Sequence, residues 1–566
     1  MKVFNTTAVC VPSKNYMVDL SERVKAIKKL VDDEKYFTIN RARQYGKTTT
    51  LTALDRYISA QYDVIFLDFQ EMSEAVFSSE NEFARCLAQA VLDAGETMEL
   101  PIPEEIDAQL KALSESEKTL VLGDIFRILD KWCALNERPL VLIIDEVDSA
   151  TNNQVFLDFL ARLRVNYIKR QRNPRFKTFQ SVILAGVTDV RYLKAKIRDD
   201  EQHKVNSPWN IAADFNIDMS LSEEGIRGML DEYEADHRTG MDTAAIAKQI
   251  REYTNGYPYL VSRICQLIDE QLMPEGPQTP GEAGVEGERT VPALQSSGEA
   301  VATDDKTSSV FQTPGEAWTE YGVDEAVKRL LSETGNAVFD SLTGKLVNYP
   351  QLKEKLRRLL LRGETIAWSP YDEEQRQLFM YGFIRNNHNT VAIANRVFEM
   401  LLYVYFIGEN DQNNALKQKA SEMKSAFIEE DGWLNVPKIM EHFITEHNRL
   451  HGENTEKFLE EEGRERFITY VSAIINGTGT YDIEPQTRTH KRMDLVIHYL
   501  GKRYIVELKI WHGDRYNEKG EQQISEYLDY FGLSTGYMLS FNFNKKKEPG
   551  VKQVRIGDKL LYEGTV

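Results

Sequence analysis

The sequence is poor in cysteine. Only four cysteines occur in 566 residues, and no two of them stand in CxxC spacing. Disulfide-stapled secreted domains and zinc knuckles both need closely spaced cysteines, so neither class fits this chain. We therefore expect a protein of a reducing, cytoplasmic setting. The four cysteines are Cys10, Cys86, Cys133 and Cys265.

Long apolar runs are also absent. No stretch approaches the ~18 consecutive apolar residues that a membrane-spanning helix needs. The first residues, Met1–Asn5, do not combine a basic start with a long apolar core, as a secretory leader does. We therefore expect a soluble protein with no membrane partner.

Positive charge is in short supply. The chain has 69 Lys and Arg residues against 88 Asp and Glu residues, which gives a formal net charge of −19 at pH 7. This balance argues against a protein that coats nucleic acid nonspecifically, although it says little about a single basic groove. With 42% hydrophobic residues, the chain is long enough for about three or four domains, each with its own core.

Short apolar runs alternate with amphipathic stretches up to about residue 272. This alternation predicts an α/β domain with a parallel sheet, which we place at residues 1–272. Four runs are rich in β-forming residues and apolar throughout, as strands buried on both faces are. These runs are Tyr36–Asn40, Val64–Phe69, Leu140–Ile144 and Val182–Gly186.

The composition changes sharply after residue 272. Residues 273–318 are rich in Pro, Gly, Glu, Ser and Thr, which predicts a disordered acidic linker, and the hexapeptide QTPGEA occurs in it twice. Residues 319–410 are mostly helical, with a hairpin-like turn signal at Asn386–Asn389, and this order suggests a winged-helix domain. A lid or partner-contact role fits its weak basic character better than direct DNA reading. Residues 411–566 form a final α/β region.

A phosphate-binding loop follows the first predicted strand. Its glycine, Gly46, lets the backbone approach phosphate at a helix start, Lys47 reaches the β and γ phosphates, and Thr48 holds magnesium. Arg41 stands where the usual GxxxxGK[ST] pattern has its first glycine, so the loop entry must tolerate a side chain. The predicted ATP contacts of this loop are Arg43, Gln44, Tyr45, Gly46, Lys47, Thr48 and Thr49.

An acidic pair follows the third predicted strand. Asp145 would anchor hydrated magnesium, and Glu146 would orient and deprotonate the attacking water. An ordinary loop start would show the same pair, but the phosphate-binding loop about a hundred residues upstream favours an ATPase.

Two more segments are candidates for contact with the nucleotide. The run Ser181–Val187 is followed by Thr188, which is suited to sensing the γ-phosphate. Pro258 opens a helix after Gly256-Tyr257, and a similar Gly-x-Pro turn lies beside the nucleotide in signal-transduction ATPases. A plain helix start with proline in its first turn explains Pro258 equally well.

Residues 36–272 resemble the AAA-like ATPases of the P-loop superfamily, in particular prokaryotic proteins with an Arg-x-Arg-Gln-Tyr/Phe-Gly-Lys-Thr loop. The resemblance implies a five-stranded ASCE-type core, ATP and magnesium as cofactors, and Glu146 as catalytic glutamate. It leaves the arginine finger open: Arg191 and Arg198 are candidates, and a homo-oligomer could complete the ATP site.

Carboxylates and a lysine gather in the last domain. In the alternating run Arg492–Tyr499, Asp494 lies on one face, and after a turn at Gly501-Lys502 the side chains of Glu507 and Lys509 point the same way. Phosphodiester hydrolysis needs magnesium held by two or more carboxylates, plus a group that activates water. A solvated amphipathic hairpin would show the same pattern, but the strongly apolar flanks of Glu507 favour a buried site.

The helix after this hairpin supports the same interpretation, because Gln523 and Tyr527 lie one turn apart and can face one site. Together these residues resemble the PD-(D/E)xK nuclease superfamily, with Met493 in place of its leading proline. The resemblance implies that Asp494 and Glu507 bind magnesium, and that Lys509 acts near the attacking water. The helix motif of RecB-like members matches Gln523-x-x-x-Tyr527. A glutamate from the preceding helix often joins such sites, and Glu462 and Glu465 compete for that place, with Glu462 favoured.

The whole chain resembles bacterial AAA-like proteins that carry a C-terminal PD-(D/E)xK domain. The resemblance implies this architecture. From the two sites together we expect an ATP-regulated, magnesium-dependent nuclease that acts on nucleic acid, with DNA favoured, in defence against or maintenance of foreign DNA. The alternative is a signalling or scaffold ATPase whose last domain holds nucleic acid or protein without cutting it.

Overall fold

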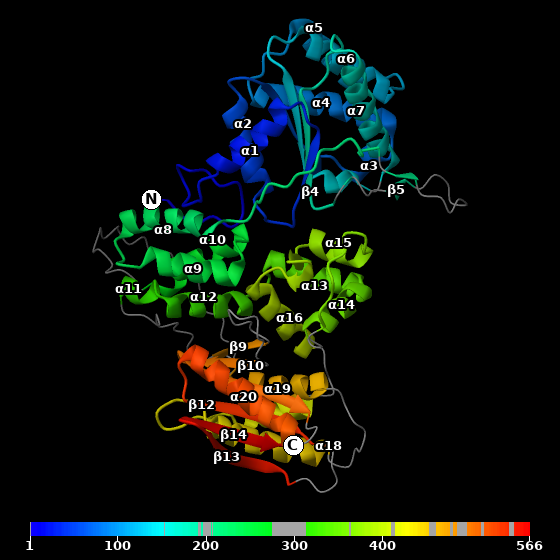
Figure 1. The fold of residues 1–566 in the computed structure, drawn as a ribbon. Helices are drawn as coiled ribbons and strands as arrows, with labels where there is room; N and C mark the ends of the chain where they lie inside the picture. The colour runs from blue at the N-terminus through cyan, green and yellow to red at the C-terminus, as the bar shows by residue number, and fades with distance from the viewer. Residues whose placement is uncertain are drawn as a thin grey trace, which may run out of the picture.

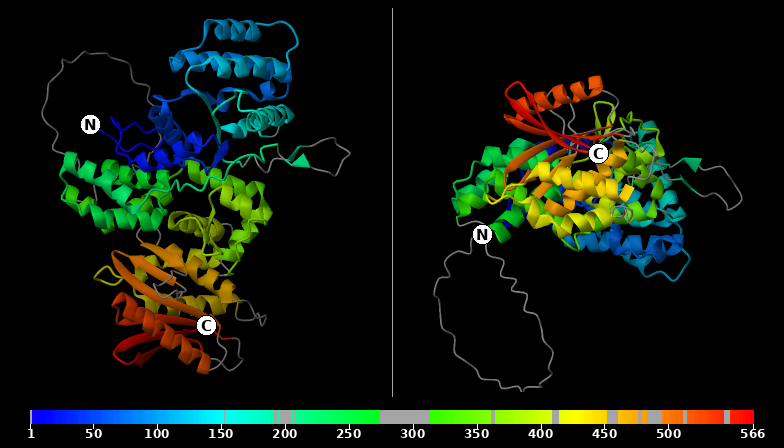
Figure 2. Two further views of the ribbon diagram at one scale, coloured as in Figure 1. Left: turned by 45° about the horizontal axis from the view of Figure 1, so that its top comes forward. Right: turned by 90° about the horizontal axis from the view of Figure 1, so that it is seen from below.

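The computed structural model describes residues 2–151, 153–188, 190, 194–195, 205–206, 208–273, 313–360, 364–408, 414–451, 460–475, 479–483, 495–510, 514–542 and 548–566. The described chain is a stack of three parts. A parallel sheet with its helices lies at the top of Figure 1, a helical layer lies in the middle and a second sheet lies at the bottom. The left view in Figure 2 shows the same order. No helix within these ranges is both long and apolar enough to cross a membrane.

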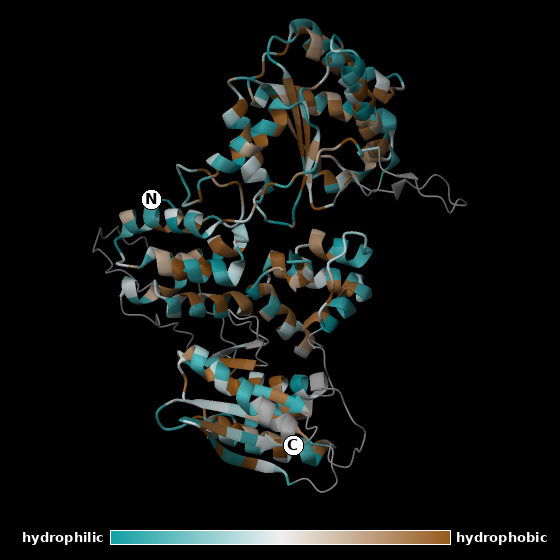
Figure 3. Cartoon of the chain, viewed as in Figure 1, coloured by the Kyte–Doolittle hydropathy of each residue, from teal (hydrophilic) through white to brown (hydrophobic). Residues whose placement is uncertain are grey.

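Four parallel strands form the upper sheet, in the order β1-β4-β3-β2. The four predicted strands are confirmed, with shifts of one residue at some ends. Figure 3 shows them as strongly hydrophobic, which agrees with burial of both faces. The strands are β1 (Phe37–Asn40), β2 (Asp63–Asp68), β3 (Leu140–Asp145) and β4 (Ser181–Gly186).

Helices cover both faces of this sheet, and each strand sends alternate side chains to the two layers. The helices α1 (Ser21–Asp32) and α2 (Lys47–Ile58) pack on one face. The opposite face carries α4 (Glu80–Thr97), α5 (Glu104–Ser114), α6 (Leu122–Leu135) and α7 (Gln154–Arg172), with the short α3 (Glu74–Phe77) beside them. A small hairpin is formed by β5 (Lys194–Ala195) and β6 (Val205–Asn206).

The fifth strand implied by the resemblance is reduced to a single pairing in the described chain. Ala213 forms one parallel bridge with Phe37, and its N–H donates to the carbonyl of Tyr36 at 2.8 Å. Phe215 stacks on Phe37 with ring centroids 5.9 Å apart. Further along, the guanidinium of Arg41 donates to the carbonyl of Ile217 at 3.0 Å. Side chains of Phe37, Phe215 and Arg41 thus hold the residues after Ala213 against this edge of the sheet.

The middle layer begins with three helices, α8 (Glu223–His237), α9 (Thr243–Thr254) and α10 (Pro258–Leu267), the last extended by a π-helical turn at Ile268–Leu272. The short α11 (Pro314–Ala317) and α12 (Glu320–Ser332) follow. The linker prediction is wrong at its end, because residues 313–318 are ordered. Thr313 and Glu316 form a capping box, and Trp318 is 1% exposed, packed on Tyr233 with ring centroids 4.8 Å apart. Residues 274–312 lie outside the described ranges.

The second half of the middle layer consists of α13 (Ala337–Asn348), α14 (Pro350–Leu360), α15 (Glu373–Met380) and α16 (Arg396–Gly408). A hairpin of β7 (Ile384–Asn387) and β8 (Thr390–Ile393) stands between the last two helices. Its turn is the one predicted: His388 and Asn389 have φ values of 49° and 66°, as a two-residue hairpin turn requires. Ala367 adds a third, one-residue bridge to Thr390. We call residues 337–408 the hairpin module.

The last part is a six-stranded mixed sheet in the order β13-β14-β12-β11-β10-β9. Its turn between β10 and β11 lies at Leu500-Gly501, one residue earlier than predicted, since both residues have positive φ. The strands are β9 (Gly479–Ile483), β10 (Leu495–Tyr499), β11 (Lys502–Ile510), β12 (Thr535–Phe541), β13 (Gly550–Ile556) and β14 (Lys559–Thr565). One face packs against the hydrophobic cluster that includes α18 (Val436–His451) and α19 (Glu460–Ile475), and α20 (Asp514–Phe531) covers the other. The helix α17 (Asn414–Glu422) precedes them.

Candidate functional site

The phosphate-binding loop joins β1 to α2 in the predicted way. Gly46 caps α2 in the left-handed region, with φ of 75°. Lys47 is buried, and its Nζ donates to the backbone carbonyls of Arg41 and Ala42, each at 3.3 Å. Burial lowers the pKa of Lys47, and the carboxylates of Glu146 and Asp145 oppose this effect. The Nζ of Lys47 thus bonds carbonyls of its own loop, and phosphate oxygens can replace these two carbonyls as acceptors.

A hydroxyl and a carboxylate meet beside this lysine. Thr48 Oγ1 donates to Asp145 Oδ2 at 2.6 Å, and Asp145 Oδ1 accepts from the N–H of Glu146 at 2.9 Å. The two oxygens come from the start of α2 and the end of β3, which parallel packing brings to one sheet edge. Oxygen ligands of this type suit Mg²⁺, which also keeps several waters and takes phosphate oxygens.

Glu146 has a strained backbone at the end of β3. Its φ is 50°, a conformation that costs a non-glycine residue roughly 1–2 kcal/mol. The residue lines the same cavity as Lys47. Burial raises the pKa of Glu146, while Lys47 lowers it. A partly desolvated carboxylate with a raised pKa is the type of group that can accept a proton from water.

Sequence reasoning missed Asp148. Its Oδ2 accepts from the N–H of Val187 at 2.6 Å and its Oδ1 from the N–H of Thr188 at 2.7 Å, so it fixes the end of β4 beside β3. A Cβ at Gly186 would lie 2.9 Å from Asp148 Oδ2, which explains the glycine at the end of this strand. The one sign of it in the sequence is that Asp148 is the third acid in Asp145-Glu146-Val147-Asp148. Its bonding partners lie about forty residues further along the chain. Thr188, the predicted γ-phosphate sensor, is therefore positioned through its backbone.

A cavity of about 410 Å³ opens above the loop, a volume within the range of small-molecule sites. Segments far apart in the sequence line it: residues 43–50, Glu146, the N-terminal residues 5–10, the start of α10 and the start of α13. Thr49 Oγ1 accepts from the N–H of Cys10 at 3.3 Å, which ties the N-terminal segment to the loop. The predicted loop residues and Glu146 therefore share one cavity with Pro258.

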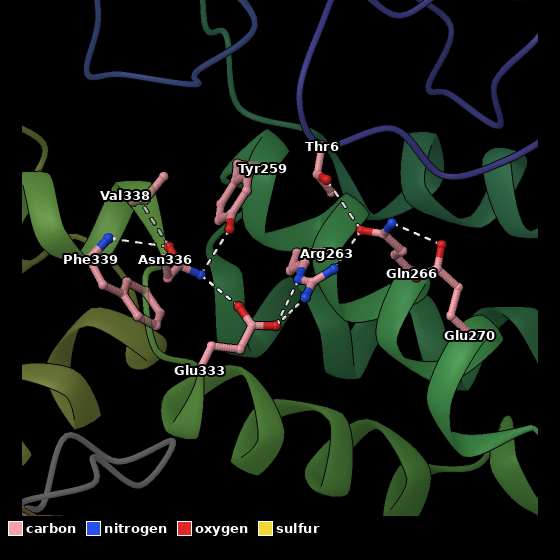
Figure 4. Close-up of polar contacts among 9 residues, drawn as sticks. All are labelled: Thr6, Tyr259, Arg263, Gln266, Glu270, Glu333, Asn336, Val338 and Phe339. Carbon is pink, nitrogen blue, oxygen red and sulfur yellow. Dashed lines mark hydrogen bonds and ion pairs between the residues drawn. The ribbon is translucent and has the colours of Figure 1, made fainter. Parts of the chain in front are cut away.

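A polar network holds the two helix starts in place around this cavity (Figure 4). Arg263 on α10 forms an ion pair with Glu333, with Nε–Oε1 at 2.8 Å. Asn336 Nδ2 donates to Glu333 Oε2 and to the hydroxyl of Tyr259, both at 2.8 Å. Asn336 Oδ1 accepts from the N–H groups of Val338 and Phe339 and so caps α13. Sequence reasoning missed this network because its members lie about seventy residues apart.

The Gly256-Tyr257-Pro258 turn contacts the phosphate-binding loop directly. The hydroxyl of Tyr257 donates to the carbonyl of Arg43, and its ring packs edge-on against Tyr45, with centroids 4.8 Å apart. Pro258 Cγ lies 3.8 Å from the position of a Cβ on Gly46. On its other side, the ring of Tyr257 packs against Phe398 of α16 at 5.1 Å. Tyr257 thus joins the loop, α10 and the hairpin module.

In the C-terminal part, four predicted residues come together on β11 and α20. Glu507 is 2% exposed, and Lys509 Nζ lies 3.2 Å from its Oε1. The same Nζ donates to Gln523 Oε1 at 3.2 Å, and Gln523 Nε2 donates to the hydroxyl of Tyr527 at 2.8 Å. A chain of polar contacts therefore runs from the strand to the helix, as the helical spacing predicted.

Other members of the predicted set lie outside the described residues: Asp494, Arg191, Arg198 and the side chain of Glu462. Its competitor Glu465 forms an ion pair with Arg357 of α14 at 3.7 Å. In the part of the chain that is described, no three or more His, Cys, Asp or Glu side chains are grouped as a metal site.

Residues 4–274 match the family model of an AAA-like domain, which supports an ATPase. No curated protein matches the sequence. Among solved structures, the Walker-type ATPase of Pyrococcus abyssi is 14% identical, with a TM-score of 0.44 over 70% of this chain and 99% of that one. The ORC1 protein of Aeropyrum pernix in complex with DNA is 10% identical, with a TM-score of 0.29 over 69% and 93%. The RuvB Holliday junction branch migration motor of Thermotoga maritima is 10% identical, with a TM-score of 0.30 over 68% and 95%.

Proposed function

We propose that the AAA-like domain of residues 4–274 binds and hydrolyses ATP with magnesium, and that its nucleotide state controls a nuclease site in residues 411–566. The observation that carries the ATPase half is the meeting of Lys47, the Thr48–Asp145 pair and Glu146 at the edge of one parallel sheet. A cation, a magnesium-type oxygen pair and a base are the groups that phosphoryl transfer to water needs.

Each residue of this site has a distinct role. Lys47 exchanges two backbone carbonyls for phosphate oxygens, and the backbone of residues 43–46, with Thr49, surrounds the phosphates. Thr48 and Asp145 would hold the magnesium, directly or through water. The magnesium neutralises charge on the phosphates when it is bound. Glu146 takes the proton of the attacking water, and Thr188 reports on the outer phosphate at the end of β4.

The nuclease half rests on Glu507, Lys509 and Gln523. The order α19–β9–β10–β11–α20–β12 places a buried carboxylate and a lysine on the central strand of a mixed sheet, beneath a helix. Leu495, the first residue of β10, pairs with Val506, which directly precedes Glu507. Asp494 directly precedes Leu495 in the sequence, and we assign it as the second magnesium ligand. Lys509 would orient the attacking water or stabilise charge on the phosphate.

Contacts through the helical layer support control of one site by the other. Tyr257 contacts both the carbonyl of Arg43 and the ring of Phe398, so a movement of the loop can displace the hairpin module. That module reaches the last domain through the ion pair between Arg357 and Glu465. Hydrophobic packing is continuous between these two contacts.

The test is cleavage of labelled single-stranded DNA, double-stranded DNA and RNA with Mg²⁺, in the presence of ATP, ADP or no nucleotide. We expect cleavage of at least one substrate, with a rate that depends on the nucleotide. Glu507→Gln and Lys509→Met should abolish it. Lys559→Met is the matched control, because Lys559 is also a buried lysine of this sheet that bonds α20, through Ser525.

A scaffold ATPase is the second candidate, because Lys509 already neutralises Glu507 in the described structure. This candidate is favoured if the protein turns over ATP but cleaves no substrate, and if Lys509→Met and Lys559→Met do not differ in either activity. Unchanged cleavage in Glu507→Gln would instead show that another site cuts.

A further inference from the structure

A second, smaller cavity lies where the hairpin module meets the outer side of the phosphate-binding loop. It measures about 200 Å³. Its lining includes Asn40 and Arg41 from the loop entry and Phe379, Arg385 and Asn395 from the hairpin module. The backbone of residues 41–45 separates it from the nucleotide cavity, and Tyr45 alone lines both. The cavity thus belongs to an interface that the ATPase site does not use.

Asn395 presents an unsatisfied donor among the residues that line this cavity. Its Oδ1 accepts from the N–H of Phe398 at 2.8 Å and caps α16, so the amide orientation is fixed. Its Nδ2 is buried and has no hydrogen-bond partner among the described residues, although the residue is only 6% exposed. The buried Oδ1 of Asn40 also lacks a partner within the described ranges. Buried polar groups are normally paired, so the unpaired Nδ2 of Asn395 indicates a ligand that accepts a hydrogen bond, whereas the Oδ1 of Asn40 needs a donor such as water.

Arginines supply positive charge to the same place. Arg41 donates only to the carbonyls of Asn40 and Ile217, and Arg385 donates to the side chain of Asn387 at 3.2 Å. Neither arginine forms an ion pair with a carboxylate in the described part of the chain. Burial lowers the pKa of Arg385, and neighbouring Arg251 lowers it further, against an opposing effect of Glu399. Arg41 and Arg385 both line the cavity, and guanidinium groups bind phosphate and carboxylate anions through paired N–H donors.

One acid lies at the rim. Asp218 also lines the cavity, but it is exposed, and its two oxygens already accept from the N–H and the hydroxyl of Ser220 at 2.8 and 2.9 Å. Burial lowers the pKa of Arg41 and Asp218 opposes this effect, but water and these bonds weaken the charge of Asp218, while the arginines are half-buried. Phe379 adds a flat apolar surface, 47% exposed, with Trp368 packed edge-on behind it at 5.4 Å.

We propose that this cavity binds one phosphate group of a nucleotide, held by Arg41, Arg385 and Asn395 Nδ2, with the base or sugar against Phe379. The cavity holds a phosphate and little more, so the rest of the ligand projects past Phe379 to solvent. The chemistry is shared by a free nucleotide and by the end of a nucleic-acid strand. The bound phosphate bridges the loop and the hairpin module where Gly382 packs on Ala42, so it strengthens their contact. This proposal is independent of nuclease activity.

The test is binding measured by calorimetry in a Lys47→Ala background, which removes phosphate binding at the ATPase loop. The probes are inorganic phosphate, AMP, and a short oligothymidine with or without a 5′-phosphate. We expect at least one phosphate-bearing probe to bind, and the oligothymidine without 5′-phosphate to bind more weakly than its phosphorylated form. Tighter binding of AMP would identify a free nucleotide as the ligand, and tighter binding of the phosphorylated strand would identify a strand end.

Arg385→Gln should weaken this binding at least about tenfold, which is the ratio that a difference of 1.4 kcal/mol gives. Arg385→Lys keeps the positive charge but loses the planar guanidinium, so its affinity should lie between that of Arg385→Gln and that of the protein with Arg385. The control is Arg376→Gln on α15 of the same module, because Arg376 forms an ion pair with Glu373 of its own helix and does not line the cavity. The proposal is overturned if no phosphate-bearing probe binds, or if Arg385→Gln and Arg376→Gln bind equally well while both remain folded by circular dichroism.

Discussion

A single methyl group at Gly256 tests whether the turn before α10 sets the shape of the nucleotide cavity. Gly256 has φ of 71°, and a Cβ there would lie 2.2 Å from the carbonyl oxygen and 2.8 Å from the nitrogen of Leu221. The left-handed backbone alone costs an alanine about 1–2 kcal/mol. Since backbone on the other side cannot swing away, Gly256→Ala must also break the bond from Leu221 N–H to the Gly256 carbonyl, worth about 1 kcal/mol.

Gly240→Ala is the matched control. Gly240 has φ of 81°, in the loop between α8 and α9, and a Cβ there meets nothing within 4 Å. Its substitution should therefore lower the free energy of unfolding by about 1–2 kcal/mol, while Gly256→Ala should lower it by about 2–3 kcal/mol, which is about 1 kcal/mol more than the control. Because Tyr257 and Pro258 follow Gly256 directly, ATP affinity should fall in the Gly256→Ala protein only.

The two quantities are measured by urea unfolding, followed by tryptophan fluorescence, and by anisotropy of a fluorescent ATP analogue. Equal losses of stability in the two variants would refute the close contact between Gly256 and Leu221. Unchanged ATP affinity in a destabilised Gly256→Ala protein would refute the role of the turn in shaping the cavity.

Three further predictions address charge. Glu146→Gln should keep ATP binding but lower phosphate release about 10²–10⁴-fold, and equal turnover in the variant would contradict a base role. Because burial raises the pKa of Glu146, wild-type turnover should fall at a higher pH, as pH is lowered, than an ordinary carboxylate predicts. Burial raises the pKa of Asp55 to about 6, so the stability associated with its neutral form is complete below pH 3.8 and lost as pH rises through about 6. Asp55→Asn should therefore stabilise the protein against urea at pH 8 but not at pH 4, and an equal gain at both pH values would count against the raised pKa. Arg263→Met should weaken ATP binding by freeing the start of α13, whereas Arg227→Met, which removes an exposed pair with Asp231 at 3.8 Å, should not.

Local sequence patterns were enough to predict the strands and part of each site. A strand buried on both faces needs an unbroken apolar run, which is why β1 to β4 were predicted almost to the residue. The shared face of Glu507 and Lys509 followed from the two-residue repeat of a strand, and the contact of Gln523 with Tyr527 from the helical turn.

Contacts between distant segments could not be predicted in this way. The pairing of Arg263 with Glu333 and the bonds of Asp148 to the end of β4 depend on how helices and strands pack, and a polar residue shows no periodicity that names its partner. Trp318 was assigned to a linker because its neighbours in sequence are polar, whereas its neighbours in space are aromatic. The bond from Arg41 to the carbonyl of Ile217, near the single bridge that remains of the fifth strand, likewise joins distant segments that no local pattern links.

Trp318 also has a practical consequence for dividing the protein. Its indole ring packs with Tyr233 from α8 and Phe4 from the N-terminal segment, although the sequence match of the ATPase ends well before it. A recombinant fragment cut at residue 272 would leave this aromatic surface bare, and exposed apolar patches of that kind promote aggregation. A fragment for crystallisation or calorimetry should therefore keep residues 313–332, joined to residue 273 by a short hydrophilic tether.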